Sequence, residues 1–256
     1  MEKKINPANF QAIYVLWLRQ IKRFLRTKSR LIANLVQPFF FLIALGFGFS
    51  FVRFEGGLNY LDFLTPGIIS MSVIFSSMFA GVSVIWDKQF GFLKEVLVAP
   101  VSRLTIVVGQ TFGGSTLAII QGLVVLGISM LLGVKINLFG VIPAILFMII
   151  IAFLAVSFGL IIASKLDDFH GFQLIMNLLI LPLIFLSGAF FPIESAPEWM
   201  RLVMFGNPLT YAVDGLRGFL VGSFAIPIYI DIFVVSITSV TLMLIGSYAF
   251  NKCEYV

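Results

Sequence analysis

The chain has 256 residues, of which 60% are hydrophobic and 11% charged, with 29 phenylalanines and a formal net charge of +5. A soluble domain carries about 25% charged residues. A globular protein of this length could not hide so much apolar surface from water, so the composition excludes a soluble protein and predicts an integral membrane protein. The modest net charge is no sign of nucleic-acid binding, and one cysteine, Cys253, excludes an intramolecular disulfide.

Residues 1–30 predict a cytoplasmic amphipathic helix that lies in the membrane interface instead of crossing the membrane. Apolar side chains recur at helical spacing from Phe10 to Leu25. The other face carries four basic side chains, those of Arg19, Lys22, Arg23 and Arg26. The helix either only anchors the chain against anionic lipid or also contacts a cytoplasmic partner, and the two roles do not exclude each other. No cleavable signal peptide is visible, so the first span is expected to direct insertion.

Six apolar stretches are long enough to cross about 30 Å of hydrocarbon, which takes roughly 20 residues. They lie at about 31–52, 63–86, 104–134, 141–163, 172–191 and 228–250. Because a helix satisfies its own backbone in lipid, we expect an all-α membrane domain over 31–256 with six transmembrane helices. The third stretch exceeds a straight span, so it should tilt or place its first turns among the headgroups.

The distribution of basic residues predicts the orientation of these spans. With a cytoplasmic N-terminus, thirteen of the 17 Lys and Arg residues lie inside and four lie outside, namely Arg53, Lys135, Arg201 and Arg217. Both termini are therefore expected in the cytoplasm, in a multi-pass protein of the cell (inner or plasma) membrane. The segment 87–103 then lies on the cytoplasmic side and 192–227 on the outer side.

The outer segment 192–227 is too interrupted to cross the membrane. Gly206-Asn207-Pro208 should end one short helix, and a second helix can run from about Leu209 to Val221. Two pairs of opposite charge stand three residues apart and can join along a helix face: Glu198 with Arg201, and Asp214 with Arg217. These features predict an outer re-entrant helical hairpin between the fifth and sixth spans, which must be shielded by protein or a water-filled cavity.

Charged side chains are almost absent from the predicted spans. Five spans contain none, and the sixth contains only Asp231 near its outer end. Ion-coupled transporters need ionisable groups near the midplane, and charged-ring channels need them along the pore, so both classes are disfavoured. Transport against a gradient would need energy from another subunit.

Two further stretches contain residues typical of nucleotide or metal sites, but a structural role is favoured for each. GQTFGGST, residues 109–116, carries Ser115 where a P-loop needs Lys, so Gly109 and Gly113 indicate close helix packing. KLDDFHGF, residues 165–172, groups Asp167, Asp168 and His170. A metal or proton site is conceivable there, but no second His or Cys cluster completes a metal shell. A solvated turn is favoured, and a second contact with a cytoplasmic partner stays open.

Two motifs resemble a known family. FGFLKEVLVAPVSR looks like the first cytoplasmic loop of ABC transporter permeases of the ABC type-2 exporter family, which includes drug-resistance, polysaccharide and lipid exporters. The positions in step are Gly91, Leu93, Glu95, Leu97, Pro100, Ser102 and Arg103. The segment from Ser187 to Gly218 is similar to the family's segment after the fifth span. Its positions in step are Pro192, Pro197, Asn207, Pro208, Tyr211 and Arg217.

The resemblance implies a half-transporter without catalytic residues, metal or cofactor of its own. Two copies, or one copy and a close paralogue, would form the pathway in contact with membrane lipids, and separate ATP-binding subunits would hold ATP and magnesium. Within 87–103, a coupling helix is expected to have an apolar buried side and to end at Pro100 before Arg103 opens the third span. The buried side comprises Phe90, Leu93, Val96 and Leu97, and Lys94 and Glu95 are left for the partner.

The predicted function is export of an apolar or amphipathic substrate such as a drug, a lipid or a lipid-linked glycan. The pathway should lie at the dimer interface, along phenylalanine-rich faces of the first, second and fifth spans. Asn34, Gln37 and Asn177 are its candidate polar contacts, unless they only bond neighbouring helices. The outer gate would comprise Pro192, Glu198, Asn207, Pro208, Tyr211, Asp214 and Arg217. A passive membrane channel or assembly factor without an ATPase partner is the alternative.

Overall fold

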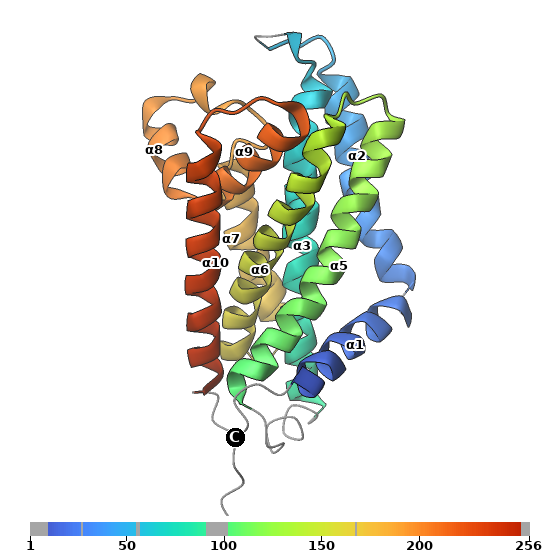
Figure 1. Cartoon of the computed structure of the whole chain (residues 1–256), viewed down its shortest axis with the longest axis vertical. Coiled ribbons are helices and arrows are strands. Elements are labelled where there is room, and N and C mark those ends of the chain that lie inside the picture. The colour runs from blue at the N-terminus through green and yellow to red at the C-terminus, as the bar shows by residue number, and fades with distance from the viewer. Residues whose placement is uncertain (1–9, 27, 55–56, 91–101, 167, 252–256) are drawn as a thin grey trace, which may run out of the picture.

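A computed structural model describes residues 10–26, 28–54, 57–90, 102–166 and 168–251, which form a bundle of helices (Figure 1). The α-helices are α1 (Phe10–Arg26), α2 (Lys28–Gly48), α3 (Tyr60–Gln89), α5 (Arg103–Leu131), α6 (Val141–Lys165), α7 (Phe169–Phe185), α8 (Glu198–Gly206), α9 (Pro208–Val221) and α10 (Ile228–Asn251). Two 3-10 turns, η2 (Leu138–Gly140) and η3 (Ile193–Ser195), precede α6 and α8. The described residues contain no strand, only an antiparallel bridge between Arg53 and Asn59.

Four helices of the described residues are long and apolar enough to cross a membrane. They are Tyr60–Asp87, Thr105–Leu131, Leu138–Lys165 and Ile228–Ala249. They correspond to the second, third, fourth and sixth predicted stretches, and they agree with an integral membrane protein. The apolar parts of α2 and α7, Leu35–Gly48 and Phe169–Phe185, are shorter.

The first and fifth predicted stretches reach beyond the helices that they contain. α2 ends at Gly48, although the apolar stretch runs to Val52. α7 ends at Phe185, because the chain then turns at Ser187 and Gly188, whose φ of 73° favours glycine. Both helices therefore end before residues 52 and 191, because the apolar residues continue into an exposed turn after α2, with Phe51 78% exposed, and into a buried turn after α7, with Phe190 8% exposed.

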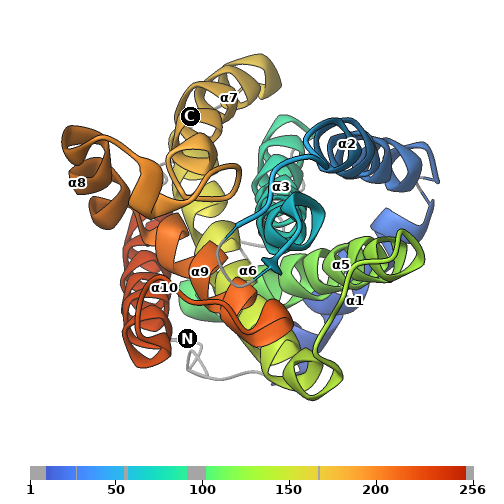
Figure 2. The ribbon, with the colours of Figure 1, turned by 90° about the horizontal axis from the view of Figure 1, so that it is seen from above.

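α6 lies in the interior of the bundle, against α3, α5 and α10 (Figure 2). Its side chains Phe147, Met148 and Ile151 are almost completely buried. Small residues let the backbones approach: a Cβ on Gly81 of α3 would lie 2.6 Å from the carbonyl oxygen of Gly159 in α6. α3 and α6 are thus held together by close backbone approach and by buried apolar side chains.

α8 and α9 lie at the end of the bundle opposite to α1 (Figure 1). The second outer helix, predicted from about Leu209, is confirmed as α9 and packs against α3, α6 and α10. α8 stands at the flank of the bundle (Figure 2), and its Trp199 and Leu202 are 67% and 71% exposed. The two outer helices therefore differ, because α9 belongs to the bundle core and α8 presents an apolar face outward.

α1 packs against α5 along a face that the amphipathic pattern identified only in part, since of its buried residues the predicted apolar face contained Phe24 alone. The buried residues of α1 are Leu16, Gln20 and Phe24, spaced one turn apart. Phe10 and Tyr14, which belong to the predicted apolar face, remain 81% and 58% exposed. α1 thus has three faces, one packed on protein, one apolar and exposed, and one basic.

The predicted close packing at Gly109 and Gly113 is confirmed, and the neighbouring helix is α1. A Cβ on Gly109 would lie 2.9 Å from the Cβ of Leu16, and one on Gly113 would lie 2.7 Å from the Cβ of Gln20. Any larger residue at these positions would push α1 away. The two glycines therefore form the packing surface for α1 on α5.

Replacing Gly113 with Ala should loosen α1, because the added methyl group overlaps the stem of Gln20. Overpacking of this kind costs about 1–3 kcal/mol. The thermal unfolding midpoint of the purified protein should fall, and proteolysis within α1 should accelerate. Gly127→Ala in the same helix is the matched control, since a Cβ there meets no atom within 4 Å. Equal unfolding midpoints and equal proteolysis of the two variants would contradict the close packing of α1 on Gly113.

Candidate functional site

Asp87, near the end of α3, joins α1 to the bundle. Its carboxylate accepts hydrogen bonds from the guanidinium groups of Arg19 and Arg23, the latter at 3.4 Å. The Arg23 guanidinium also lies over the ring of Trp86, 4.7 Å from its centroid. Trp86 stacks on Phe169 of α7 with 6.2 Å between ring centroids. We call Arg19, Arg23, Trp86 and Asp87 the α1 junction, since they connect α1, α3 and the start of α7.

The electrostatics of the α1 junction favour the docked position of α1. The side chain of Asp87 is only 5% exposed, whereas those of Arg19 and Arg23 are 29% and 31% exposed. Partial burial lowers the pKa of Arg23, and the neighbouring Asp87 carboxylate opposes that shift. A buried carboxylate without its cations would be strongly unfavourable. α1 therefore neutralises a charge that α3 cannot neutralise by itself.

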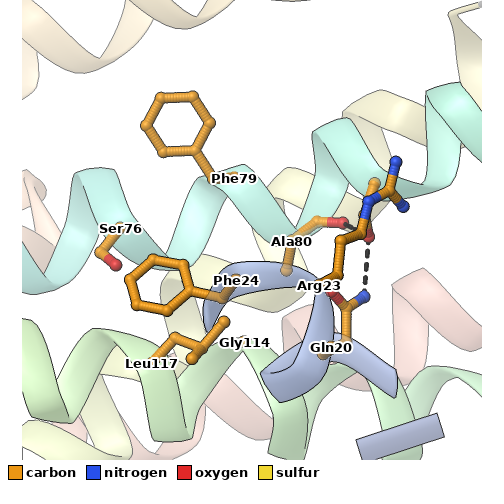
Figure 3. Close-up of a pocket in the computed structure, with 9 residues that line it drawn as sticks. Gln20, Arg23, Phe24, Ser76, Phe79, Ala80, Gly114 and Leu117 are labelled. Atoms are coloured by element: carbon orange, nitrogen blue, oxygen red, sulfur yellow. Dashed lines mark hydrogen bonds between the residues drawn. The ribbon is translucent and has the colours of Figure 1, made fainter. Parts of the chain in front are cut away.

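A small cavity of about 20 Å³ lies beneath α1, between α3 and α5 (Figure 3). Gln20 donates from its Nε2 to Ser83 Oγ at 2.7 Å, and that hydroxyl donates to the Ala80 carbonyl at 2.6 Å. Trp17 makes a second link by donating to Thr116 Oγ1 of α5 at 3.0 Å. The cavity has room for about one water molecule and none for a substrate. It is a packing feature that orients α1.

The predicted coupling segment starts directly at the α1 junction. α3 ends at Gln89, and α5 begins at Arg103 after its N-cap, Ser102, whose Oγ accepts from Thr105 N at 3.1 Å. Phe90 follows the last turn of α3 and is 82% exposed, and its predicted place on the buried side of a coupling helix stays a prediction. The other predicted coupling residues, Gly91, Leu93, Lys94, Glu95, Leu97 and Pro100, lie outside the described residues.

The second predicted cytoplasmic contact is the turn between α6 and α7. Asp168 is the N-cap of α7 and accepts from Gly171 N at 2.5 Å, while His170 is exposed. Asp167 lies outside the described residues. Within the described ranges no three acidic, His or Cys side chains come together as metal ligands. The capping role accounts for Asp168, and a partner contact at this turn remains a prediction.

A groove of about 80 Å³ runs between α3 and α7. Its lining is aromatic and thioether-rich with two amides at its rim: Phe75, Met78, Phe79, Val82, Phe169, Phe172, Gln173, Met176 and Asn177. Asn177, a predicted polar contact, thus lies among phenylalanines of the second and fifth stretches. Gln37, a second predicted polar contact, is exposed on α2 and does not line this groove. The side chain of Asn34, the third, is not among those that the structure describes.

A second, fully apolar cavity of about 170 Å³ lies along the same seam, where α3 and α7 meet α6, α9 and α10. It is bordered by Met78, Phe158 and Leu183, and by Pro208 and Leu209 at the start of α9. The seam between α3 and α7 is therefore less tightly filled than the contact between α3 and α6.

At the opposite end of the bundle, Arg217 of α9 is 4% exposed. The predicted pair with Asp214 is confirmed, with 3.8 Å between Nη1 and Oδ1. The guanidinium also donates to the Gly188 carbonyl at 2.7 Å and lies 3.9 Å from the centroid of the Phe63 ring. Arg217 thus fastens α9 to the start of α3 and to the turn after α7.

Two further predicted residues of the outer gate complete this attachment. Asp214 accepts hydrogen bonds from Ile226 N at 2.8 Å and from Ala225 N, so it holds the loop before α10. Asn207, the N-cap of α9, donates to the Leu183 carbonyl at 2.7 Å. We call Asn207, Asp214 and Arg217 the outer cluster.

The remaining gate residues make local contacts. Tyr211 donates to the Phe205 carbonyl at 2.8 Å, Pro192 is the N-cap of η3, and Glu198 is the exposed first residue of α8. Arg201, which was predicted to pair with Glu198, donates a hydrogen bond to the Glu194 carbonyl at 2.9 Å. Of the outer cluster, Asp214 and Arg217 are in contact, whereas Asn207 fastens the start of α9 to the end of α7.

Sequence reasoning missed two buried carboxylates. Asp62 at the start of α3 accepts from Lys135 N at 3.1 Å, which ties down the loop after α5. Asp231 of α10 is 0% exposed, and neither carboxylate oxygen has a hydrogen-bond partner in the described part of the chain. Asp231 lies opposite Gly215 of α9, where a Cβ would stand 3.3 Å from the Asp231 Cβ. Each residue is far in sequence from what surrounds it, so no local pattern reveals the contact.

Arg217→Met should destabilise the protein by about 3–5 kcal/mol, because it leaves the buried Asp214 without its cation. The measurement is the thermal unfolding midpoint of the detergent-solubilised protein. Arg53→Met, which removes an exposed cation at the same end, is the matched control and should change the midpoint little. An Arg217→Met protein as stable as this control would show that the outer cluster does not hold α9.

Comparison with known proteins assigns the family. Residues 11–221 match the family described as ABC-2 type transporter. The chain is similar to ycf38 of Cyanophora paradoxa, named as a transport permease, with 30% identity over 224 residues that cover 84% of this chain and 77% of that protein. It is 28% identical over 216 residues to the inner membrane transport permease YadH of Escherichia coli (strain K12), covering 82% and 83% of the two chains.

A third relative is nodulation protein J of Rhizobium leguminosarum bv. viciae, with 24% identity over 197 residues and 76% of each chain covered. The residues matched by the family contain nearly all of α1, three of the four candidate spans (those of α3, α5 and α6) and the outer cluster. The resemblance inferred from the two motifs is therefore confirmed over most of the chain, and this membrane protein belongs to the ABC-2 type transporter family of transport permeases.

Proposed function

We propose that this chain is the membrane subunit of an ATP-driven exporter, and that a separate ATP-binding subunit holds ATP and magnesium. The observation that carries the proposal is the α1 junction, which lies directly before the segment that resembles a coupling loop. A push on that segment would reach α3 through its last turn, and α1 and α7 through Asp87 and Trp86. Packed elements of this kind transmit movement as rigid bodies.

The proposed topology has six crossings, with α2 and α7 as the two that complete the four longer spans. At 1.5 Å per residue, the 21 residues of α2 reach about 32 Å and the 17 of α7 about 25 Å. Both termini would be cytoplasmic, following the basic residues. α8 and α9 would form the re-entrant hairpin on the outer side, shielded where the outer cluster holds α9 in the bundle.

The proposed pathway uses two copies of the permease, or one copy and a close paralogue. α2 and α7 both flank α3 (Figure 2), and both expose large apolar side chains, including Phe40 at 62% and Leu178 at 70%. A second copy against this side would enclose the groove between α3 and α7. Its phenylalanines and its Asn177 suit an apolar or amphipathic substrate with a polar end.

Glu95→Arg should uncouple the permease from its ATPase, because it reverses a charge offered to the partner. The complex would be reconstituted in liposomes, and permease-dependent ATP hydrolysis and co-purification of the two subunits would be measured. We expect stimulation to fall at least tenfold. Glu198→Arg makes the same change on exposed α8 at the other end and is the matched control. Unchanged stimulation and assembly in Glu95→Arg would rule out the coupling role.

Co-purification also separates the proposal from the alternative class. Recovery of a soluble ATP-binding protein with the wild-type permease supports the exporter. A permease that purifies alone, and that conducts solutes in liposomes without ATP, would instead be a passive channel.

A further inference from the structure

The exposed side of α1 forms a basic groove beside Asp87. The groove has a volume of about 730 Å³ and is lined by Val15, Leu18, Arg19, Lys22, Arg23, Arg26 and Asp87. Among the described residues, four cations thus face one carboxylate. Arg19 and Arg23 already contact Asp87, whereas Lys22 and Arg26 extend from the exposed face of α1. The groove therefore carries positive charge in excess of what the α1 junction neutralises.

Apolar surface continues from this groove along α1. Val15 is 60% exposed at its border, and Phe10, Tyr14 and Leu25 are exposed on the adjoining face. Cations next to an exposed apolar face match the two parts of a membrane lipid, a charged headgroup and acyl chains. A free anion would match the cations alone and would leave the apolar face uncovered.

We propose that this groove is a binding site for the headgroup of one anionic phospholipid, whose acyl chains lie along Val15 and the exposed apolar face of α1. Lys22 and Arg26 bind the phosphate. Arg19 and Arg23 are shared between the headgroup and Asp87, so the lipid competes with Asp87 for its two cations. The lipid bound here would thereby adjust how firmly α1 is held to α3.

The proposal rests on the proposed placement of α1 at the cytoplasmic surface of the membrane. It differs from general attraction of a basic helix to a charged surface, because it assigns opposite effects to neighbouring residues. Removing Lys22 and Arg26 should weaken binding. Removing the charge of Asp87 should strengthen it, since one negative charge that attracts Arg19 and Arg23 is lost from the groove.

The test is native mass spectrometry of the detergent-solubilised permease, titrated with dioleoyl phosphatidylglycerol or dioleoyl phosphatidylcholine. The wild-type protein should bind the first phosphatidylglycerol at least tenfold more tightly than phosphatidylcholine. The double variant K22Q/R26Q should weaken the binding of phosphatidylglycerol by about fivefold for each cation removed. Asp87→Asn should tighten it several-fold.

The matched control is R53Q/K135Q, which removes two exposed cations from the opposite end of the bundle. Its affinity for phosphatidylglycerol should stay within twofold of the wild type. Equal losses in the two double variants would overturn the proposal, because the effect would then follow net charge. Equal affinity of the wild type for the two lipids would overturn it as well.

A third arm adds inorganic phosphate during the titration. If millimolar phosphate displaces the lipid fully, the groove is a free-phosphate site and the lipid proposal fails. Should Asp87→Asn lower the thermal unfolding midpoint, the K22Q/R26Q comparison decides alone, since it leaves the α1 junction intact. The measurement needs neither an ATPase nor transport, so its failure is distinguishable from a failure of the Glu95→Arg test.

Discussion

The ion pairs of Asp87 set the arrangement of one end of this protein. A carboxylate that is almost fully buried at the end of an apolar helix must meet a cation, and Arg19 and Arg23 are supplied by α1. The two arginines reach Asp87 only if α1 approaches α5 closely, which Gly109 and Gly113 permit because they have no side chain. The charge and the glycines therefore act together, because either alone would leave α1 without a fixed position.

At the opposite end of the bundle, buried charges are also paired, but by a different set of residues. Arg217 is the buried cation described there, and its partners are Asp214, the Gly188 carbonyl and the Phe63 ring. Between the two ends most of the buried side chains are apolar or small, although Gln110 and Gln121 are buried there as well.

The sequence predicted features that depend on composition or on near neighbours. The membrane class, α9 and the pair of Asp214 with Arg217 belong here, since three residues of helix bring the two charges together. It did not predict the contact of Arg19 with Asp87, which are 68 residues apart. Of the packed face of α1, Phe24 was part of the predicted apolar face, whereas Leu16 and Gln20 were missed because amphipathic patterns assume two environments and α1 has three. The ends of α2 and α7 were missed because apolar residues continue beyond them.

Asp231 has a consequence for how the protein is made. α10 exposes much of its length to the surroundings of the bundle, yet its one carboxylate is completely covered. An acidic residue near the end of an otherwise apolar helix adds only a modest cost to insertion by the translocon. α10 can therefore enter the bilayer by itself, and the carboxylate becomes enclosed only when α9 settles against it through Gly215. Enclosure of Asp231 thus depends on the close packing of α9 against α10, and a larger residue at Gly215 would disturb it.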